Sequence, residues 1–171
     1  MDYANPMQKP HIEKVVFNIG VGESGEKLVK AEKLLSKLTG RKPVRTMSKH
    51  KIPAWGLRKG EPIGCMVTFR GKAAEEMLKK SFEAVENTIS PKMFDKYGNF
   101  GVGVREYIDF PGMKYDPEIG IFGFTVTATM KRPGGRISKR KNKPARVPEK
   151  SRLAKTDSID FIKEKFGVKV E

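Results

Sequence analysis

The sequence holds few of the residues from which disulfides, metal sites and membrane spans are built. It has one cysteine, Cys65, and two histidines, His11 and His50, among 171 residues. A single cysteine excludes an internal disulfide and fits a reducing compartment. The histidines lack the spacing of a metal site, and the longest uncharged stretch, 119–130, is shorter than the roughly 20 apolar residues of a membrane helix. We therefore expect no metal, no disulfide and no membrane contact.

Targeting and catalytic signatures are missing as well. The N-terminal stretch MDYANPMQKPHIEK has no apolar run, so no secretory signal is expected and the cytoplasm is the default location. No P-loop, no G-x-S-x-G motif and no Cys/His nucleophile signature occurs. The length suits one domain, residues 1–171, with a core that needs no covalent support.

Positive charge is plentiful and segregated. The chain has 35 Lys and Arg against 20 Asp and Glu, a net charge of +15. Seven Lys or Arg and no acid fall in residues 41–60, part of the segment 41–62 that we call the basic loop. Eleven Lys or Arg against one Glu fall in residues 131–155, the basic extension. The rest of the chain is nearly neutral, which indicates a polyanionic partner, and nucleic acid rather than a membrane because no basic amphipathic helix occurs.

Hydrophobic periodicity predicts the elements of an α+β fold. Apolar residues recur at helical spacing in 25–39, in 72–89 and from Thr156 to Gly167, and β-branched or alternating residues predict strands. The strands are expected at 15–20, 43–47, 63–70, 101–110 and 123–131. This order predicts a largely antiparallel sheet with helices packed on one face, followed by a basic C-terminal extension that ends in a short helix. The extension has no periodicity and is expected to be disordered on its own.

One short motif allows an enzymatic interpretation. The stretch GVGESG, residues 20–25, matches G-x-G-x-x-G after a strand and before a helix, the setting of a dinucleotide-binding turn. Against this, the preceding strand contains Asn18, the turn contains Glu23, and no acidic residue follows to hold a ribose. A tight strand-to-helix turn that needs glycine conformations is the commoner explanation of such a motif. A nucleotide-dependent enzyme remains the alternative.

The only tryptophan, Trp55, lies within the basic loop. Cations that follow phosphates and aromatics that stack on exposed bases are the usual means of holding single-stranded or looped RNA. Lys49, His50, Lys51, Arg58 and Lys59 surround Trp55 in the sequence, so the loop has the composition of an RNA contact. Composition does not decide whether Trp55 stacks on a base or folds back over the sheet.

Five stretches together resemble one family. VVFNIGVGES, LTGRKPVRTMSK, LRKGEPIGCMVTFRG, YGNFGVGVREYIDFP and RLAKTDSIDFIKEKFGV are similar, in this order, to the large-subunit ribosomal protein family known as L-five. The resemblance runs from about His11 to Val168, and PIGCMVTFRG and GNFGVGVREYIDFP are its most specific parts. The segment after Met130 resembles the archaeal and eukaryotic branch, and the archaeal form is the better match.

The resemblance implies a non-enzymatic structural protein of the large ribosomal subunit that binds 5S rRNA in the central protuberance. It implies that a hairpin loop of 5S rRNA rests on the sheet, where Asn18, Trp55 and Thr68 match positions of contact. Arg41 departs from the family, which usually has glutamine there, and a guanidinium donates hydrogen bonds but cannot accept them. The basic loop would extend toward the peptidyl-site tRNA, and the loop 111–122 (PGMKYDPEIGIF) would bridge to a protein of the small-subunit head.

We therefore predict a ribosome-associated RNA-binding protein without a cofactor, whose partners are 5S rRNA, large-subunit rRNA, the peptidyl-site tRNA, other proteins of the central protuberance and a small-subunit head protein. The predicted RNA-binding residues are Asn18, Arg41, Arg45, Lys49, Lys51, Trp55, Arg58, Lys59, Thr68, Arg136, Lys139, Arg140 and Lys141. Neither a catalytic residue nor a metal ligand is predicted.

Overall fold

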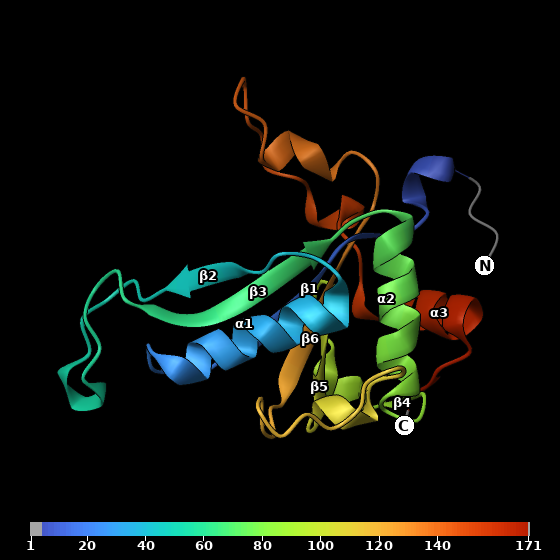
Figure 1. The fold of residues 1–171 in the computed structure, drawn as a ribbon. Coiled ribbons are helices and arrows are strands. Elements are labelled where there is room, and N and C mark those ends of the chain that lie inside the picture. Colours follow the sequence, from blue (N-terminus) through green and yellow to red (C-terminus); the bar gives the residue numbers. More distant parts are fainter. Residues whose placement is uncertain (1–4, 171) are drawn as a thin grey trace. The chain divides into compact units, whose positions relative to one another are not determined.

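The structure, a computed structural model, describes residues 5–170, the side chain of Lys150 excepted. Its helices and strands follow one another as shown in Figure 1. They are β1 (His11–Gly20), α1 (Glu26–Thr39), β2 (Val44–Met47), β3 (Pro62–Phe69), α2 (Lys72–Glu83), β4 (Thr88–Ile89), β5 (Phe100–Val104), β6 (Phe124–Lys131), α3 (Lys155–Phe166) and β7 (Lys169–Val170). None of the described helices is long and apolar enough to cross a bilayer.

Five of the strands form one mostly antiparallel sheet in the order β2-β3-β1-β6-β5. The edge strand β2 pairs antiparallel with β3, and the register shifts between Thr46 and Met47. The short strands β4 and β7 pair with each other in parallel. The predicted α+β class with a largely antiparallel sheet is confirmed.

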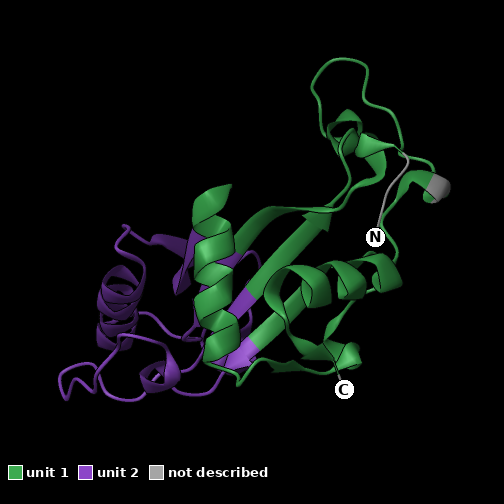
Figure 2. Ribbon diagram, turned by 90° about the vertical axis from the view of Figure 1, so that its right-hand side faces the viewer, with its two compact units in different colours: residues 1–15, 69–102, 127–171 green, residues 16–68, 103–126 purple. Residues whose placement is uncertain are grey.

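The contacts of the chain group into two compact units, coloured separately in Figure 2. Unit 2 comprises Val16–Thr68 and Gly103–Val126, and unit 1 comprises the chain up to Val15, Phe69–Val102 and the chain from Thr127 onward. Each unit has its own aromatic cluster.

In unit 2, α1 supplies an apolar face whose members, Leu28, Ala31, Leu34, Leu35 and Leu38, are all buried. These are the residues whose spacing predicted the helix, and Gly40 ends it in the left-handed conformation that closes many helices. Phe17, Phe110 and Phe124 form a cluster with ring centroids 5.8–6.1 Å apart. Aromatic packing of this kind joins β1, β6 and the segment around Phe110 within unit 2.

In unit 1, Phe82 of α2 is the centre of the core. Its ring lies 6.0 Å from that of Phe100 on β5 and 5.3 Å from that of Phe166 on α3. Phe94 adds a further contact with Phe100 at 5.1 Å. The C-terminal helix is thus part of a packed core, as its buried Ile162 also shows.

Two predicted elements end earlier than their patterns indicated. The helix predicted over 72–89 stops at Glu83, because Glu86 and Asn87 adopt φ values of 53° and 55° and the Asn87 amide donates to the Phe82 carbonyl at 2.8 Å. Ile89, assigned to the helical stripe, is instead buried in β4. The strand predicted over 101–110 ends at Val104, since the chain turns into a short 3-10 helix, Tyr107–Asp109.

Candidate nucleic-acid interface

The strands of unit 2 have one buried and one exposed face. Along β1, Phe17 and Ile19 are buried while Asn18 is exposed, and along β3, Val67 is buried while Thr68 is exposed. Successive side chains of a strand point to opposite faces, so Asn18 and Thr68 lie on the exposed face of neighbouring strands. Two of the three residues expected from the resemblance to contact 5S rRNA therefore share one surface, which we call the open face.

Gly103 on β5 and Thr125 on β6 belong to the same open face by the same alternation. Together with Asn18, Gly20, Arg105 and Gly123 they line a shallow hollow of unit 2. A methyl group added at Gly20 or Gly103 would meet no heavy atom within 4 Å. The hollow thus presents the short polar side chains of Asn18 and Thr125 beside uncovered glycine backbone, with the cation Arg105 among its lining residues.

The basic loop forms a defined hairpin rather than an irregular loop. Figure 1 shows it reaching beyond the ends of β2 and β3. Paired backbone hydrogen bonds of 3.0 and 3.1 Å join Ile52 and Leu57, and a 3-10 turn, Pro53–Trp55, forms the tip. Leu57 is buried, whereas Trp55 is 74% exposed. Leu57, and not Trp55, packs against the protein, so Trp55 does not fold back over the sheet.

Glu61 braces the base of the hairpin. Its carboxylate accepts hydrogen bonds from the Arg58 amide at 2.9 Å and from the Ser24 hydroxyl at 2.7 Å. These hydrogen bonds, the Arg58 amide first, hold the pKa of Glu61 below its ordinary value. The carboxylate of Glu61 is therefore bound by groups of unit 2 itself. The exposed amino groups of Lys49, Lys51 and Lys59 form no ion pair with another described residue.

Arg45 lies apart from the open face. It is paired across the sheet with Cys65, which is buried, and residues directly opposite each other on two strands share a face. Its guanidinium binds Glu32 of α1, and this hydrogen bond lowers the pKa of the Glu32 carboxyl. Part of its charge is thus neutralised on the helix side, while Arg41 is exposed near the end of α1.

The basic extension has a defined conformation, which corrects the prediction that it is disordered. It contains two 3-10 turns, Gly135–Ser138 and Glu149–Ser151, and Leu153 is buried. The sequence pattern missed this because the contacts that hold the extension come from distant residues. Arg136, Lys139, Arg140 and Lys141 are all exposed on it.

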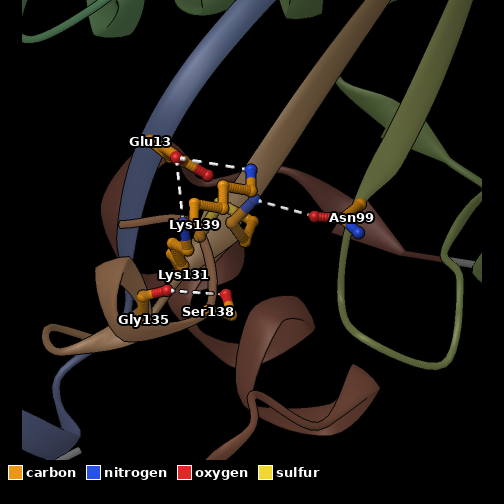
Figure 3. A network of polar contacts seen from close by, with 7 residues as sticks. Glu13, Asn99, Lys131, Gly135, Ser138 and Lys139 are labelled. Atoms are coloured by element: carbon orange, nitrogen blue, oxygen red, sulfur yellow. Dashed lines mark hydrogen bonds and ion pairs between the residues drawn. The ribbon is translucent and has the colours of Figure 1, made fainter. Parts of the chain in front are cut away.

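Glu13 on β1 is the first of these distant anchors. Figure 3 shows its carboxylate between the amino groups of Lys131 and Lys139, at 3.0 and 4.0 Å from the nearer oxygen. Burial raises the pKa of Glu13, but the hydrogen bond and the charge of Lys131, with Lys139 and Lys14, outweigh burial and bring it below its ordinary value. The carboxylate is therefore charged at neutral pH and draws the start of the extension onto unit 1.

Asp157 in the first turn of α3 is the second anchor. It accepts a hydrogen bond from Arg132 at 2.5 Å. Arg132 also donates to the Arg152 carbonyl at 3.2 Å, so one guanidinium joins the two ends of the extension. Arg152 in turn donates to the Tyr97 hydroxyl at 3.0 Å and to the Val147 carbonyl at 3.3 Å.

All thirteen predicted RNA-binding residues are exposed, but they do not form one patch. The structure brings Asn18 and Thr68 to the open face, places five in the hairpin and four on the basic extension, sets Arg45 against α1, and leaves Arg41 just beyond the end of α1. Sequence reasoning missed Gly103, Arg105 and Thr125, although the alternation in GVGVRE and FTVTATM carried the signal. It also missed Glu13 and Asp157, for which no local pattern exists.

The glycine turn at 20–25 does not have the form of a dinucleotide site. The amides of Val21 and Gly22 both donate to the Ile63 carbonyl, at 3.0 and 2.9 Å, so they are not directed at a ligand. The strand after α1 is not bonded to β1, because β3 lies between β1 and β2. Gly22 and Gly25 have φ values of 79° and 119°, which a side chain would strain, and this explains the glycines.

No group of three or more His, Cys, Asp or Glu side chains suited to a metal occurs within residues 5–170. His11 and His50, the two histidines, are exposed and lie in different units. Cys65 is fully buried, and burial raises the pKa of its thiol to about 11.

Comparison with known families identifies two matching regions. Residues 5–58 match the model described as ribosomal protein L5, and residues 62–161 match the model of the C-terminus of the same ribosomal family. The boundary between the two falls at the end of the basic loop.

Individual relatives match over nearly the full chain. A protein of Methanosphaera stadtmanae called large ribosomal subunit protein uL5 is 49% identical, over 98% of this chain and 99% of its own length. The protein of the same name in Sulfurisphaera tokodaii is 50% identical, over 97% of this chain and 94% of its own. That of Methanococcus aeolicus is 50% identical, over 97% and 93%.

Proposed function

The chain belongs to the ribosomal protein L5 family, and on that premise we propose that it is a non-enzymatic component of the large ribosomal subunit that binds 5S rRNA through the open face of its sheet. Relatives of about 50% identity are named as large-subunit proteins, which supports the assignment to this subunit. Their archaeal sources agree with the archaeal branch expected from the sequence.

The observation that carries the proposal is the open face itself. Asn18 and Thr68 take no part in the core, and nothing in unit 2 covers Gly20 or Gly103. Short amide and hydroxyl groups on a rigid sheet suit the edges and riboses of an RNA loop, where the 2′-hydroxyl and unpaired bases are accessible. Asn18 and Thr68 would make these contacts, with Arg105 on a nearby phosphate.

The hairpin of the basic loop would add a second contact. Trp55 is 74% exposed, so its ring is free to stack on an unpaired base, and the surrounding cations would hold phosphates. We assign Trp55 to 5S rRNA and the rest of this hairpin to the peptidyl-site tRNA, as the resemblance implies, while the basic extension would contact large-subunit rRNA and neighbouring proteins of the central protuberance.

The loop 111–122 has the features of a protein contact. Tyr115 and Ile121 are 56% and 63% exposed, yet the loop is held in place because the Asp116 amide donates to the buried Tyr107 hydroxyl at 2.8 Å. Lys37 of α1 binds the Asp116 carboxylate and lowers its pKa. A fixed loop with exposed apolar groups would suit the small-subunit head protein.

Competition binding tests the proposal against the alternative of a generic polyanion binder. Purified protein is titrated with 5S rRNA and with duplex DNA of equal length at the same salt concentration. We expect 5S rRNA to bind at least tenfold more tightly, because an open face recognises unpaired nucleotides and cations alone do not. Equal affinities would contradict the proposal, and saturable micromolar binding of NADPH would revive the enzymatic alternative.

A further inference from the structure

A cavity of about 650 Å³ lies within unit 1, between the basic extension and the segment around Tyr97. Its volume falls within the roughly 300–1,000 Å³ of small-molecule sites. It is distinct from the open face, the hairpin and the loop 111–122, none of which contributes a residue to it.

The walls of the cavity are apolar and its rim is cationic. Ile137, Val147 and Leu153 supply aliphatic surface, and Tyr97 supplies an aromatic ring. The charged side chains that line it are Lys131, Arg132, Lys139, Arg146 and Arg152, with no Asp or Glu among them. Glu13 and Asp157, which do not line the cavity, bind three of these cations, and Arg146 forms no ion pair with another described residue.

The planar group best placed for recognition is the guanidinium of Arg152. It is fixed by the Tyr97 hydroxyl and the Val147 carbonyl, and its central carbon lies 5.2 Å from the centroid of the Tyr97 ring. A guanidinium held in this way offers a flat cationic surface on which a base stacks. The apolar wall beside such a group suits a partner that is flat, largely apolar and joined to an anion.

We propose that this cavity binds one unstacked nucleotide of an RNA chain, with the base between the apolar wall and Arg152 and its phosphate at Arg146. This inference depends on one part of the proposed function, namely that the basic extension binds RNA. Charge complementarity selects this occupant, because an apolar side chain of a protein would leave Arg146, which has no ion-pair partner among the described residues, without a counterion.

Introducing a carboxylate at the cavity tests the proposal. Ser151 lines it, is exposed, and its side chain forms no hydrogen bond with the described residues, so Ser151→Glu preserves the fold. Asn142→Glu adds the same charge to the same extension outside the cavity. Both variants are titrated with a mixed-sequence single-stranded RNA decamer and with a fully paired RNA duplex of equal length.

We expect Ser151→Glu to weaken single-strand binding about tenfold more than Asn142→Glu does, and both variants to bind duplex equally. Photocrosslinking with a 5-iodouridine decamer should label Tyr97 in the wild type and in Asn142→Glu but not in Ser151→Glu. Equal losses in the two variants, or no label at Tyr97, would overturn the proposal and leave a protein side chain as the occupant. Displacement by micromolar UMP would overturn it in favour of a free nucleotide.

A second pair of variants tests the cavity independently, in case Ser151→Glu disturbs the fold. Arg146→Ala removes the rim cation and Lys141→Ala removes an exposed cation elsewhere on the extension. The former should cost at least fivefold more single-strand affinity, and equal costs would contradict the cavity. The preference of the wild type for 5S rRNA over duplex DNA is measured in parallel. If the wild type shows no such preference but Ser151→Glu still weakens single-strand binding, the proposed function is refuted and the cavity proposal stands.

Discussion

Asn18, Thr68 and Gly103 show, at the scale of single residues, why the open face is proposed as a binding surface. Asn18 and Thr68 are polar groups on strands whose alternate residues are buried. Gly103 has an ordinary strand φ and open space around its missing side chain, so nothing within unit 2 requires glycine there. Glycine weakens a strand interior, and it commonly marks a place where a ligand approaches the backbone closely.

Substitution of Gly103 by valine separates stability from RNA binding. The side chain has space in the folded protein, and valine favours strands, so the free energy of unfolding should stay equal or rise by up to about 1 kcal/mol. Binding of 5S rRNA should fall at least tenfold, because the branched side chain would stand on the open face. Urea unfolding and filter binding measure the two effects, and unchanged 5S affinity would remove Gly103 from the interface.

Cys65 shows the opposite case of a residue used only for packing. Its thiol is fully buried and its pKa is raised to about 11, so almost no thiolate exists at neutral pH. We expect the native protein to react with a thiol reagent at least a hundredfold more slowly than the unfolded chain does. Rapid labelling of the native protein at pH 7 would show that β3 opens readily.

At the scale of elements, local patterns determined some parts of the structure and distant contacts determined others. The spacing of Leu28, Leu35 and Leu38 predicted α1 because the face it buries is continuous. The chain leaves the helical path after α2 because Glu86 and Asn87 adopt positive φ angles. Neither residue is glycine, so the hydrophobic periodicity gives no sign that the helix ends there. The extension depends on Glu13, more than 100 positions away in the sequence from Lys131.

Only some residues of the open face could be predicted from the sequence, because the others depend on which strands lie next to each other. Asn18 and Thr68 came from the resemblance to a family, whereas Gly103 and Thr125 follow once the neighbouring strands are known. Trp55 was open to two interpretations because the burial of Leu57 cannot be read from composition.

Glu13→Gln tests how the extension is held. The change removes the charge that binds Lys131 and Lys139, and hydrogen bonds to charged groups contribute about 1.5–3 kcal/mol. Local opening of the extension should become roughly ten- to a hundredfold more frequent, measured as the rate of limited trypsin cleavage within 136–146 at pH 7. Glu76→Gln, an exposed glutamate on α2, is the control and should cleave at the wild-type rate.

Acid should release the extension in the same way. The pKa of Glu13 is lower in the folded protein than its ordinary value of about 4.3, so its contribution is complete above roughly pH 5. It is lost as the pH falls through the folded pKa. The amide resonances of residues 135–140 should therefore shift below about pH 4 in the wild type and not in Glu13→Gln, and identical titrations would exclude Glu13 as the anchor.

At the scale of the whole molecule, the net charge of +15 divides into two cationic segments and a nearly neutral remainder. Recognition is assigned to the open face and general RNA affinity to the segments. The two should respond differently to salt, because only the cationic contacts release counterions.

Neutralising Lys139, Arg140 and Lys141 to glutamine tests this division. The slope of log affinity against log salt for large-subunit rRNA should decrease by about 2–3, at roughly 0.7–0.9 for each lost phosphate contact. The preference for 5S rRNA over duplex DNA should be preserved. Neutralising Lys30, Lys33 and Lys79 on the helices is the control, and a slope change of the same size there would contradict a dedicated extension.

The affinity of Asn18→Ala for 5S rRNA at moderate salt tests the central claim most directly. A lost hydrogen bond in a closed interface costs about 1–3 kcal/mol, so binding should weaken by roughly five- to a hundredfold, while Asn142→Ala on the extension stays within twofold of the wild type. Thr68→Ala should behave like Asn18→Ala. Unchanged 5S rRNA affinity in Asn18→Ala and Thr68→Ala, with the fold intact, would show that the open face is not where 5S rRNA binds.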